Sequence, residues 1–131
     1  MLEAVDAARF VSGFSVNLPA GKPAGLTSPE AELARMPGAV SGRPAAAAAD
    51  RTIAELYRRM DRARHVIIGS GGVFSAAHAY RKIRLGASLV QLMTALVYEG
   101  PGVVGAINRG LAGLLEADGF AKVADAVGAD S

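Results

Sequence analysis

Cysteine is absent from this chain of 131 residues, and aromatic residues make up only 5% of it. The lack of cysteine excludes disulfide bonds, thiolate metal ligands and a cysteine nucleophile, although it does not identify a cellular compartment. An excess of one charge is also missing, because the net charge is only +2 and no segment interleaves arginine with aromatic residues. The composition therefore gives no support to nucleic-acid binding.

Long hydrophobic runs are missing as well. The longest apolar run, residues 87–98, has 12 residues and contains Gln91, whereas a membrane-spanning helix needs about 20. Glu3 and Asp6 stand in the region where a secretory signal peptide would carry positive charge. The sequence therefore predicts a cytoplasmic protein without a membrane span.

The chain does contain a regular alternation of short apolar strands with amphipathic helices. Strands are predicted at residues 14–17, 65–69 and 87–92. Helices are predicted at residues 2–11, 45–60, 75–85, 102–115 and 120–127. Strands that are apolar throughout and separated by helices are typical of a parallel sheet. We therefore predict an α/β fold in which residues 1–131 form one unit.

One long segment interrupts this alternation. Residues 18–43 are rich in proline and glycine, with one helical turn predicted at residues 29–35. Loops of this length inside a compact domain are usually functional or disordered. We predict that residues 18–43 form a functional or mobile loop.

A glycine-rich loop, Gly69-Ser70-Gly71-Gly72, separates the strand at residues 65–69 from the helix at residues 75–85. Glycines there let backbone N–H groups approach an anion, and the next helix adds its positive end; a tight turn is the alternative explanation. Met93 and Thr94 end the neighbouring strand, so Thr94 could offer its hydroxyl and N–H to the same anion. In a (β/α)8 barrel, the loops after strands seven and eight commonly hold a phosphate.

Other polar residues give weaker signals. Asn17 ends the first predicted strand, where its amide could bind a carboxylate or a pyrimidine, although asparagine is also common in turns. The segment Ser41–Pro44 could bring backbone N–H groups to a cofactor or could simply start a helix. His65 and His78 have no histidine or carboxylate at ligand spacing, so no metal site is predicted.

The order and spacing of several segments resemble the C-terminal part of the quinone-dependent (class 2) dihydroorotate dehydrogenases. Ser41-Gly42-Arg43-Pro44 is similar to the family's Ser-Gly-(Arg/Lys)-Pro, and residues 67–73 are similar to its Ile-Ile-Gly-Val-Gly-Gly-Val. Residues 79–92 resemble its strand-eight signature, and residues 118–130 resemble its ending. The resemblance implies a partial (β/α)8 TIM barrel, about strands six to eight, because a complete barrel needs about 250 residues.

This resemblance implies a flavin enzyme of pyrimidine biosynthesis. In that family FMN is held on the barrel, dihydroorotate is oxidised to orotate, and the electrons pass to a quinone. The resemblance puts Gly42, Gly72, Met93 and Thr94 at FMN-binding positions, and Gly71 joins them as part of the glycine loop. These five residues are our predicted cofactor site.

The chain also departs from the family pattern. Met93 stands where the family usually has tyrosine, which preserves a backbone N–H but removes aromatic packing. The family's substrate-contacting Asn-Thr-Thr is matched only by Asn17. The family's serine base, its lysine near the flavin and its quinone-docking helices, which make full-length relatives peripheral on the membrane, all precede the matching region. Because a base and a flavin must be positioned together, we expect no turnover by this chain alone.

Two functions stay open at this point. The first is an oxidoreductase segment that carries the FMN phosphate site. The second is a non-catalytic remnant or assembly module that binds at most an anion, since open sheet edges invite self-association or pairing with the missing N-terminal half of a barrel. A doubly wound nucleotide-binding domain is disfavoured, because the glycine loop comes late and no ribose-binding acid follows it at about 20 residues.

Overall fold

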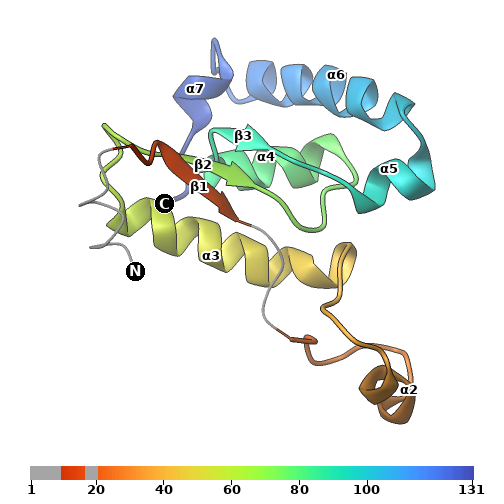
Figure 1. Cartoon of the computed structure of the whole chain (residues 1–131). Helices are drawn as coiled ribbons and strands as arrows, with labels where there is room; N and C mark the ends of the chain where they lie inside the picture. The colour runs from red at the N-terminus through yellow and green to blue at the C-terminus, as the bar shows by residue number, and fades with distance from the viewer. Residues whose placement is uncertain (1–9, 17–20) are drawn as a thin grey trace.

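The computed structural model describes residues 10–16 and 21–131, and it is an α/β structure with a small sheet (Figure 1). The helix predicted at residues 2–11 lies almost entirely outside the described residues, and so does Asn17. The order of elements after these gaps follows the predicted alternation, with one additional helix.

The sheet has three parallel strands in the order β1 (Gly13–Val16), β2 (Val66–Gly69) and β3 (Leu89–Val90). This arrangement confirms the predicted parallel sheet. The third strand is shorter than the predicted residues 87–92, because the N–H of Ala87 donates to Lys82 of the preceding helix instead of to a strand. The N–H of Gln91 still donates to Gly69, so the two strands stay together to the end of β3.

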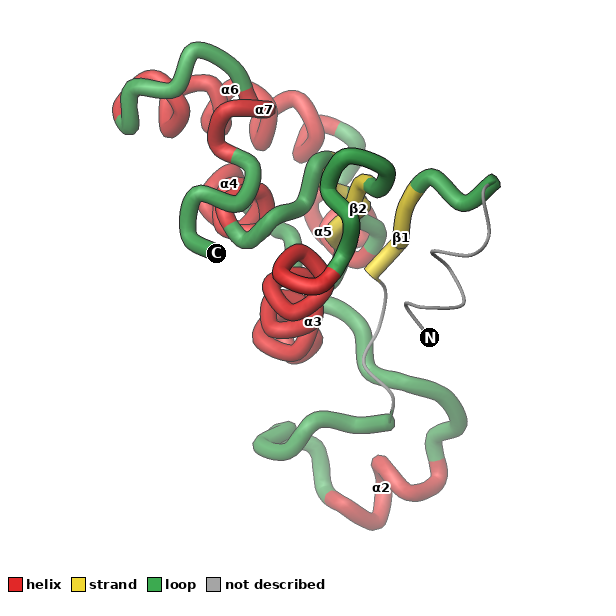
Figure 2. The backbone as a smooth tube through the Cα atoms, turned by 90° about the vertical axis from the view of Figure 1, so that its left-hand side faces the viewer, coloured by secondary structure: helices red, strands yellow, loops and turns green. Residues whose placement is uncertain are grey.

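Helices α3 (Ala46–Arg59) and α4 (Ala76–Arg84) cover one face of this sheet. A Cβ placed on Gly69 would lie 2.9 Å from Ile53 of α3 and 3.5 Å from the Cβ of Lys82 of α4, so both helices face the same side of β2. Ile53 and Ile67 are completely buried there. Figure 2 shows α3 and α4 along one side of the strands, with α6 farther out beyond α4.

The opposite face of the sheet has no covering element among the described residues. Side chains alternate along a strand, and of the residues that point away from the helices Val66 is 44% exposed and Leu89 is 60% exposed, while the central Ile68 is half-buried. Ser15 of β1 is exposed on the same face. The sequence predicted apolar strands in a parallel sheet, and within the described part of the chain only the helix-covered face of that sheet is buried.

The remaining helices lie outside the sheet. Helix α2 (Glu30–Arg35) confirms the turn predicted at residues 29–35, and α3 is preceded by a short 3₁₀ turn, η1 (Arg43–Ala45). Helix α6 (Gly102–Ala117) was predicted, whereas α7 (Val123–Ala126) is shorter than predicted. None of the helices in the described part of the chain is long and apolar enough to span a bilayer.

Helix α5 (Thr94–Glu99) is the element that the sequence did not predict. Its residues continue the apolar run of β3, so no change of composition marks the end of the strand. The helix stops at Gly100, which has a φ of 73°. Val97 and Tyr98 on this helix are 76% and 77% exposed, so α5 forms without burying most of its apolar side chains.

The end of the chain is held on α4 by charged and aromatic contacts. Arg84 donates to Asp118 and to Asp130 at 2.6 Å each, and its guanidinium lies over the ring of Tyr80. The Tyr80 hydroxyl donates to Asp118 at 2.7 Å. The hydrogen bond to Asp130 raises the pKa of Arg84 above its already high ordinary value, so this side chain stays charged.

Tyr80 gives the chain a predictable loss of stability in alkali. Burial, and then the hydrogen bond to Asp118, raise the pKa of Tyr80 above its ordinary value. The neutral phenol is therefore favoured by folding. Its contribution is complete below the pKa of the unfolded chain, about 10, and is lost as the pH rises through the higher pKa of the folded chain.

Urea unfolding from about pH 8 to about pH 11 should therefore show a steeper fall in unfolding free energy for the wild-type chain than for Tyr80→Phe. The phenylalanine variant keeps the ring and removes the titrating group. Parallel curves for the two proteins would contradict this assignment.

Candidate functional site

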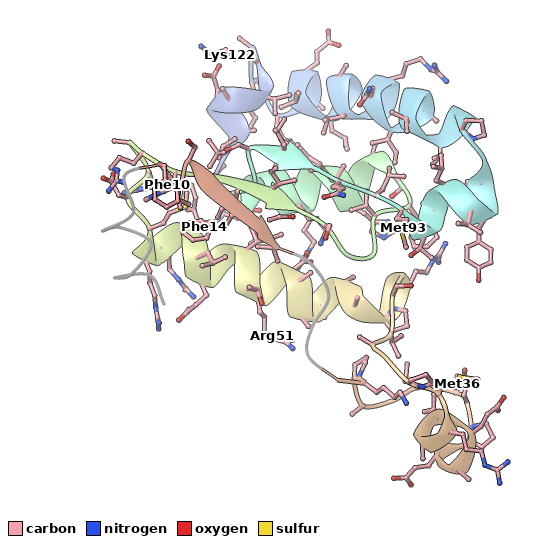
Figure 3. The ribbon with its side chains drawn as sticks, in the orientation of Figure 1. Phe10, Phe14, Met36, Arg51, Met93 and Lys122 are labelled. Carbon is pink, nitrogen blue, oxygen red and sulfur yellow. The ribbon has the colours of Figure 1, made fainter. Side chains whose placement is uncertain are left out.

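A pocket of about 220 Å³ lies at the carboxyl ends of the strands, lined by residues 41–42, 70–74 and 91–95. The first segment lies at the end of the long loop and the other two follow β2 and β3, so the parallel sheet brings all three to one edge. Met93 marks this end of the molecule in Figure 3, whereas Phe10 and Phe14 lie at the opposite end of the sheet. The five predicted cofactor residues, Gly42, Gly71, Gly72, Met93 and Thr94, all line the pocket.

Gly71 and Gly72 lie directly against the first turns of η1 and α3. Both have positive φ, 89° and 72°, a conformation that favours glycine. A Cβ on Gly72 would come within 2.5 Å of the Cβ of Ala46, and one on Gly71 within 2.9 Å of the Cβ of Ala49. The loop therefore needs glycine on its own side and a small residue on the helix, which explains alanine at positions 45, 46 and 49.

The first and third segments of the lining meet beside this loop. A Cβ on Gly42 would lie 3.1 Å from the Thr94 methyl group and 3.8 Å from the ring of Phe74. The guanidinium of Arg43 lies over that ring, 5.0 Å from its centre. Gly42 therefore contacts both other segments of the lining, the third through Thr94 and the second through Phe74.

The backbone supplies polar groups to the pocket, together with the side chains of Ser41, Ser70, Gln91 and Thr94. None of the residues that line it carries a charged side chain. Within residues 10–16 and 21–131, the N–H groups of Gly71, Gly72, Met93 and Thr94 have no backbone acceptor. Backbone N–H groups gathered around glycines bind anions such as phosphate. The lining therefore fits the phosphate group of a nucleotide or flavin.

The helix after the glycine loop begins where it was predicted. Ser75 is the residue before α4, and its side chain accepts the N–H of His78 at 3.4 Å. His78 Nδ1 in turn accepts the N–H of Phe74 at 3.3 Å. The histidine therefore acts in a reciprocal cap of the helix start, and this structural task accounts for a residue that the sequence left without a role.

Two features near the site were not predicted from the sequence. The Ser70 hydroxyl donates to the carbonyl of Val16 at 2.6 Å and so ties the loop to β1. Asp50 and Lys82 form a buried ion pair between α3 and α4. Lysine on an amphipathic helix is ordinarily exposed, so only the three-dimensional structure reveals this pair. Asn17, the predicted substrate contact, lies outside the described residues.

Comparisons with known proteins agree with one another. Residues 15–115 match the family model of dihydroorotate dehydrogenase. The chain is 48% identical over 107 residues to the dihydroorotate dehydrogenase (quinone) of Deinococcus deserti. The aligned region covers 82% of this chain and 29% of that protein. It is 54% identical over 93 residues to the protein of the same name from Rhodospirillum rubrum, covering 71% and 25% respectively.

The fold is also similar to a solved structure. The ligand-free dihydroorotate dehydrogenase of Eimeria tenella superposes with a TM-score of 0.83 at 33% identity, over 97% of this chain and 34% of that chain. The chain therefore spans about a quarter to a third of the length of the relatives that it matches.

Proposed function

Because the chain belongs to the dihydroorotate dehydrogenase family, we propose that it forms the flavin-phosphate-binding end of a dihydroorotate-oxidising (β/α)8 barrel. In this proposal β1, β2 and β3 correspond to strands six, seven and eight, residues 1–131 act as one segment, and residues 18–43 form a functional loop. The observation that carries the proposal is the pocket at the carboxyl ends of the strands, to which all five predicted cofactor residues contribute.

The chemistry of the lining supports FMN as the cofactor. Gly42, Gly71, Gly72, Met93 and Thr94 would hold its phosphate, through N–H groups and the threonine hydroxyl. When bound, FMN supplies the two-electron acceptor that oxidation of dihydroorotate requires. The residues of this chain would bind the phosphate end of the cofactor and fix its position at the barrel rim.

Complete turnover would require more of the barrel than these three strands. The side chains of Val66 and Leu89 are exposed on the uncovered face of the sheet, which is the face that a closed barrel fills with side chains from the other strands. We therefore propose that dihydroorotate and a quinone are substrates of an assembled barrel, and that Asn17 contacts dihydroorotate there. This chain alone would hold the cofactor without oxidising substrate.

A flavin titration tests the proposal. The chain should quench FMN fluorescence saturably, and riboflavin should bind at least about tenfold more weakly, since it lacks the phosphate whose charged hydrogen bonds the pocket supplies. Inorganic phosphate should compete with FMN. Equal affinity for FMN and riboflavin would contradict a phosphate site. Steady oxidation of dihydroorotate by the pure chain would contradict the proposal that this chain alone holds the cofactor without oxidising substrate.

The uncovered sheet face favours a second candidate, a non-catalytic assembly module. The edges of β1 and β3 and the exposed Val66 and Leu89 would then pair with another copy or with the remainder of a barrel. Sedimentation at increasing concentration distinguishes the two proposals. Association without FMN binding supports the module, whereas FMN binding by a monomer at every concentration supports the enzyme segment.

A further inference from the structure

Asp50 and Lys82 form an ion pair in the interior of the molecule, outside the lining of the pocket. Lys82 Nζ lies 2.7 Å from Asp50 Oδ1, and the two residues are only 1% and 8% exposed. The exposed side chain of Arg81 also contacts the carboxylate, with its Nε 2.7 Å from Asp50 Oδ2. Both oxygens of the carboxylate are therefore engaged, and the lysine charge is paired.

This pair joins the two helices between which the glycine loop lies. Asp50 follows Ala49 on α3, and the Cβ of Ala49 is 2.9 Å from the position that a Cβ on Gly71 would take. Lys82 belongs to α4, and its own Cβ is 3.5 Å from the corresponding position at Gly69. Lys82 itself therefore lies beside the first glycine of the loop, whereas Asp50 is next in sequence to the alanine that contacts Gly71.

Holding two helices together does not require buried charges. Removing an aspartate and a lysine from water is costly, and an apolar pair of similar size often stabilises a protein as well or better. The ion pair adds a defined geometry, because charge-assisted hydrogen bonds are short and geometrically selective. Such bonds fix the separation and rotation of α3 against α4 more narrowly than apolar packing does.

We propose that Asp50 and Lys82 are positioning residues for the anion pocket: their ion pair fixes the alanine face of α3 against the glycine loop and so aligns the N–H groups of Gly71 and Gly72. The inference deepens the proposed function and rests on it for the nature of the ligand. Neither residue touches the ligand. The sequence places them 32 residues apart on separate helices, and only the fold brings them together.

The test compares stability with loop geometry in matched variants. Asp50→Leu/Lys82→Met removes both charges and leaves no buried ion unpaired. Glu55→Gln is the control, because it removes the acid from two surface ion pairs, with Arg58 and Arg59, on the same helix at the end away from the loop. For each protein we would measure urea unfolding, the Kd for FMN, and amide hydrogen exchange at Ser70 and Gln91, whose hydrogen bonds to Val16 and Gly69 flank the loop.

The double variant should unfold at the same urea concentration as the wild-type chain or higher. Its Kd for FMN should nevertheless rise about tenfold, because small misplacements of binding groups are costly. Exchange at Ser70 and Gln91 should accelerate about tenfold while the amides of α6 stay unchanged, a sign of local opening. Glu55→Gln should leave all three measurements at wild-type values.

A purely structural role would move stability and affinity together, so a double variant that loses both overturns the proposal. Wild-type exchange together with wild-type affinity overturns it as well. If the double variant does not fold, Asp50→Asn decides: faster exchange confined to Ser70 and Gln91 supports positioning, and uniform acceleration across the chain overturns it. If the wild-type chain does not bind FMN, the proposed function fails, and the exchange measurements still decide the positioning role.

Discussion

Replacing Gly72 with aspartate is expected to abolish detectable FMN binding while the chain stays folded. Two effects combine at this position. The φ of 72° disfavours any side chain, and a Cβ would come within 2.5 Å of the Cβ of Ala46, so the loop must move away from α3. The new carboxylate would also stand beside the phosphate. Like charges in contact cost several kcal/mol, so Kd should rise about 100-fold or more.

The matched control for this prediction is Gly119→Asp. Gly119 has a similar φ of 78°, but a Cβ there would meet nothing within 4 Å, and the residue is not part of the pocket lining. This variant carries the same backbone strain and the same added charge at a distance from the site. FMN titrations of the two variants, with circular dichroism to verify folding, make the comparison. A wild-type affinity of Gly72→Asp for FMN would show that the glycine loop does not take part in binding FMN.

Gly86→Ala is expected to lower the free energy of unfolding by about 2–4 kcal/mol, the sum of overpacking and backbone strain. Gly86 follows α4 with a φ of 117°, and a Cβ there would overlap the ring of Tyr57 on α3. The ring has no room to retreat, because Gly128 of the C-terminal segment packs on its other atoms and its hydroxyl donates to Val127. Tyr57 is therefore held between two glycines.

Urea unfolding of Gly86→Ala beside Gly119→Ala separates the two causes. Gly119→Ala introduces the strain of a positive φ alone, about 1–2 kcal/mol, since the space around it is open. The difference between the variants reports the clash with Tyr57. Equal loss of stability in both would show that the close contact between Gly86 and the ring of Tyr57 does not contribute to the effect.

Local features of the fold could be predicted from the sequence because their causes are local. The apolar strand at residues 65–69, the glycines after it and Ser75 before the next helix form a strand, a loop and a helix start from neighbouring residues, and the structure has β2, the loop and α4 in those places. Exposed arginines at the end of α3, among them Arg58 and Arg59, follow from helical periodicity in the same way.

Other local boundaries were missed where composition did not change. Helix α5 continues the apolar run of β3, so nothing in the sequence separates the strand from the helix, and β3 itself is shorter than the run. The start of α5 at Thr94 is set by where pairing with β2 ends. Pairing depends on a strand that lies 20 residues earlier in the chain, and a local pattern does not contain that information.

For the candidate site too, some features could be predicted from the sequence and others depend on the tertiary structure. The sequence by itself determined the glycine loop, the segment at Gly42 and the pair Met93-Thr94, because backbone N–H groups near glycine are a local property, and it determined family membership through the order of these motifs. Only the tertiary structure decided that the three segments line one pocket, that alanines must face Gly71 and Gly72, and that Lys82 is buried against Asp50. Close approach and burial depend on elements distant in sequence, so they exist only once the helices pack on the sheet.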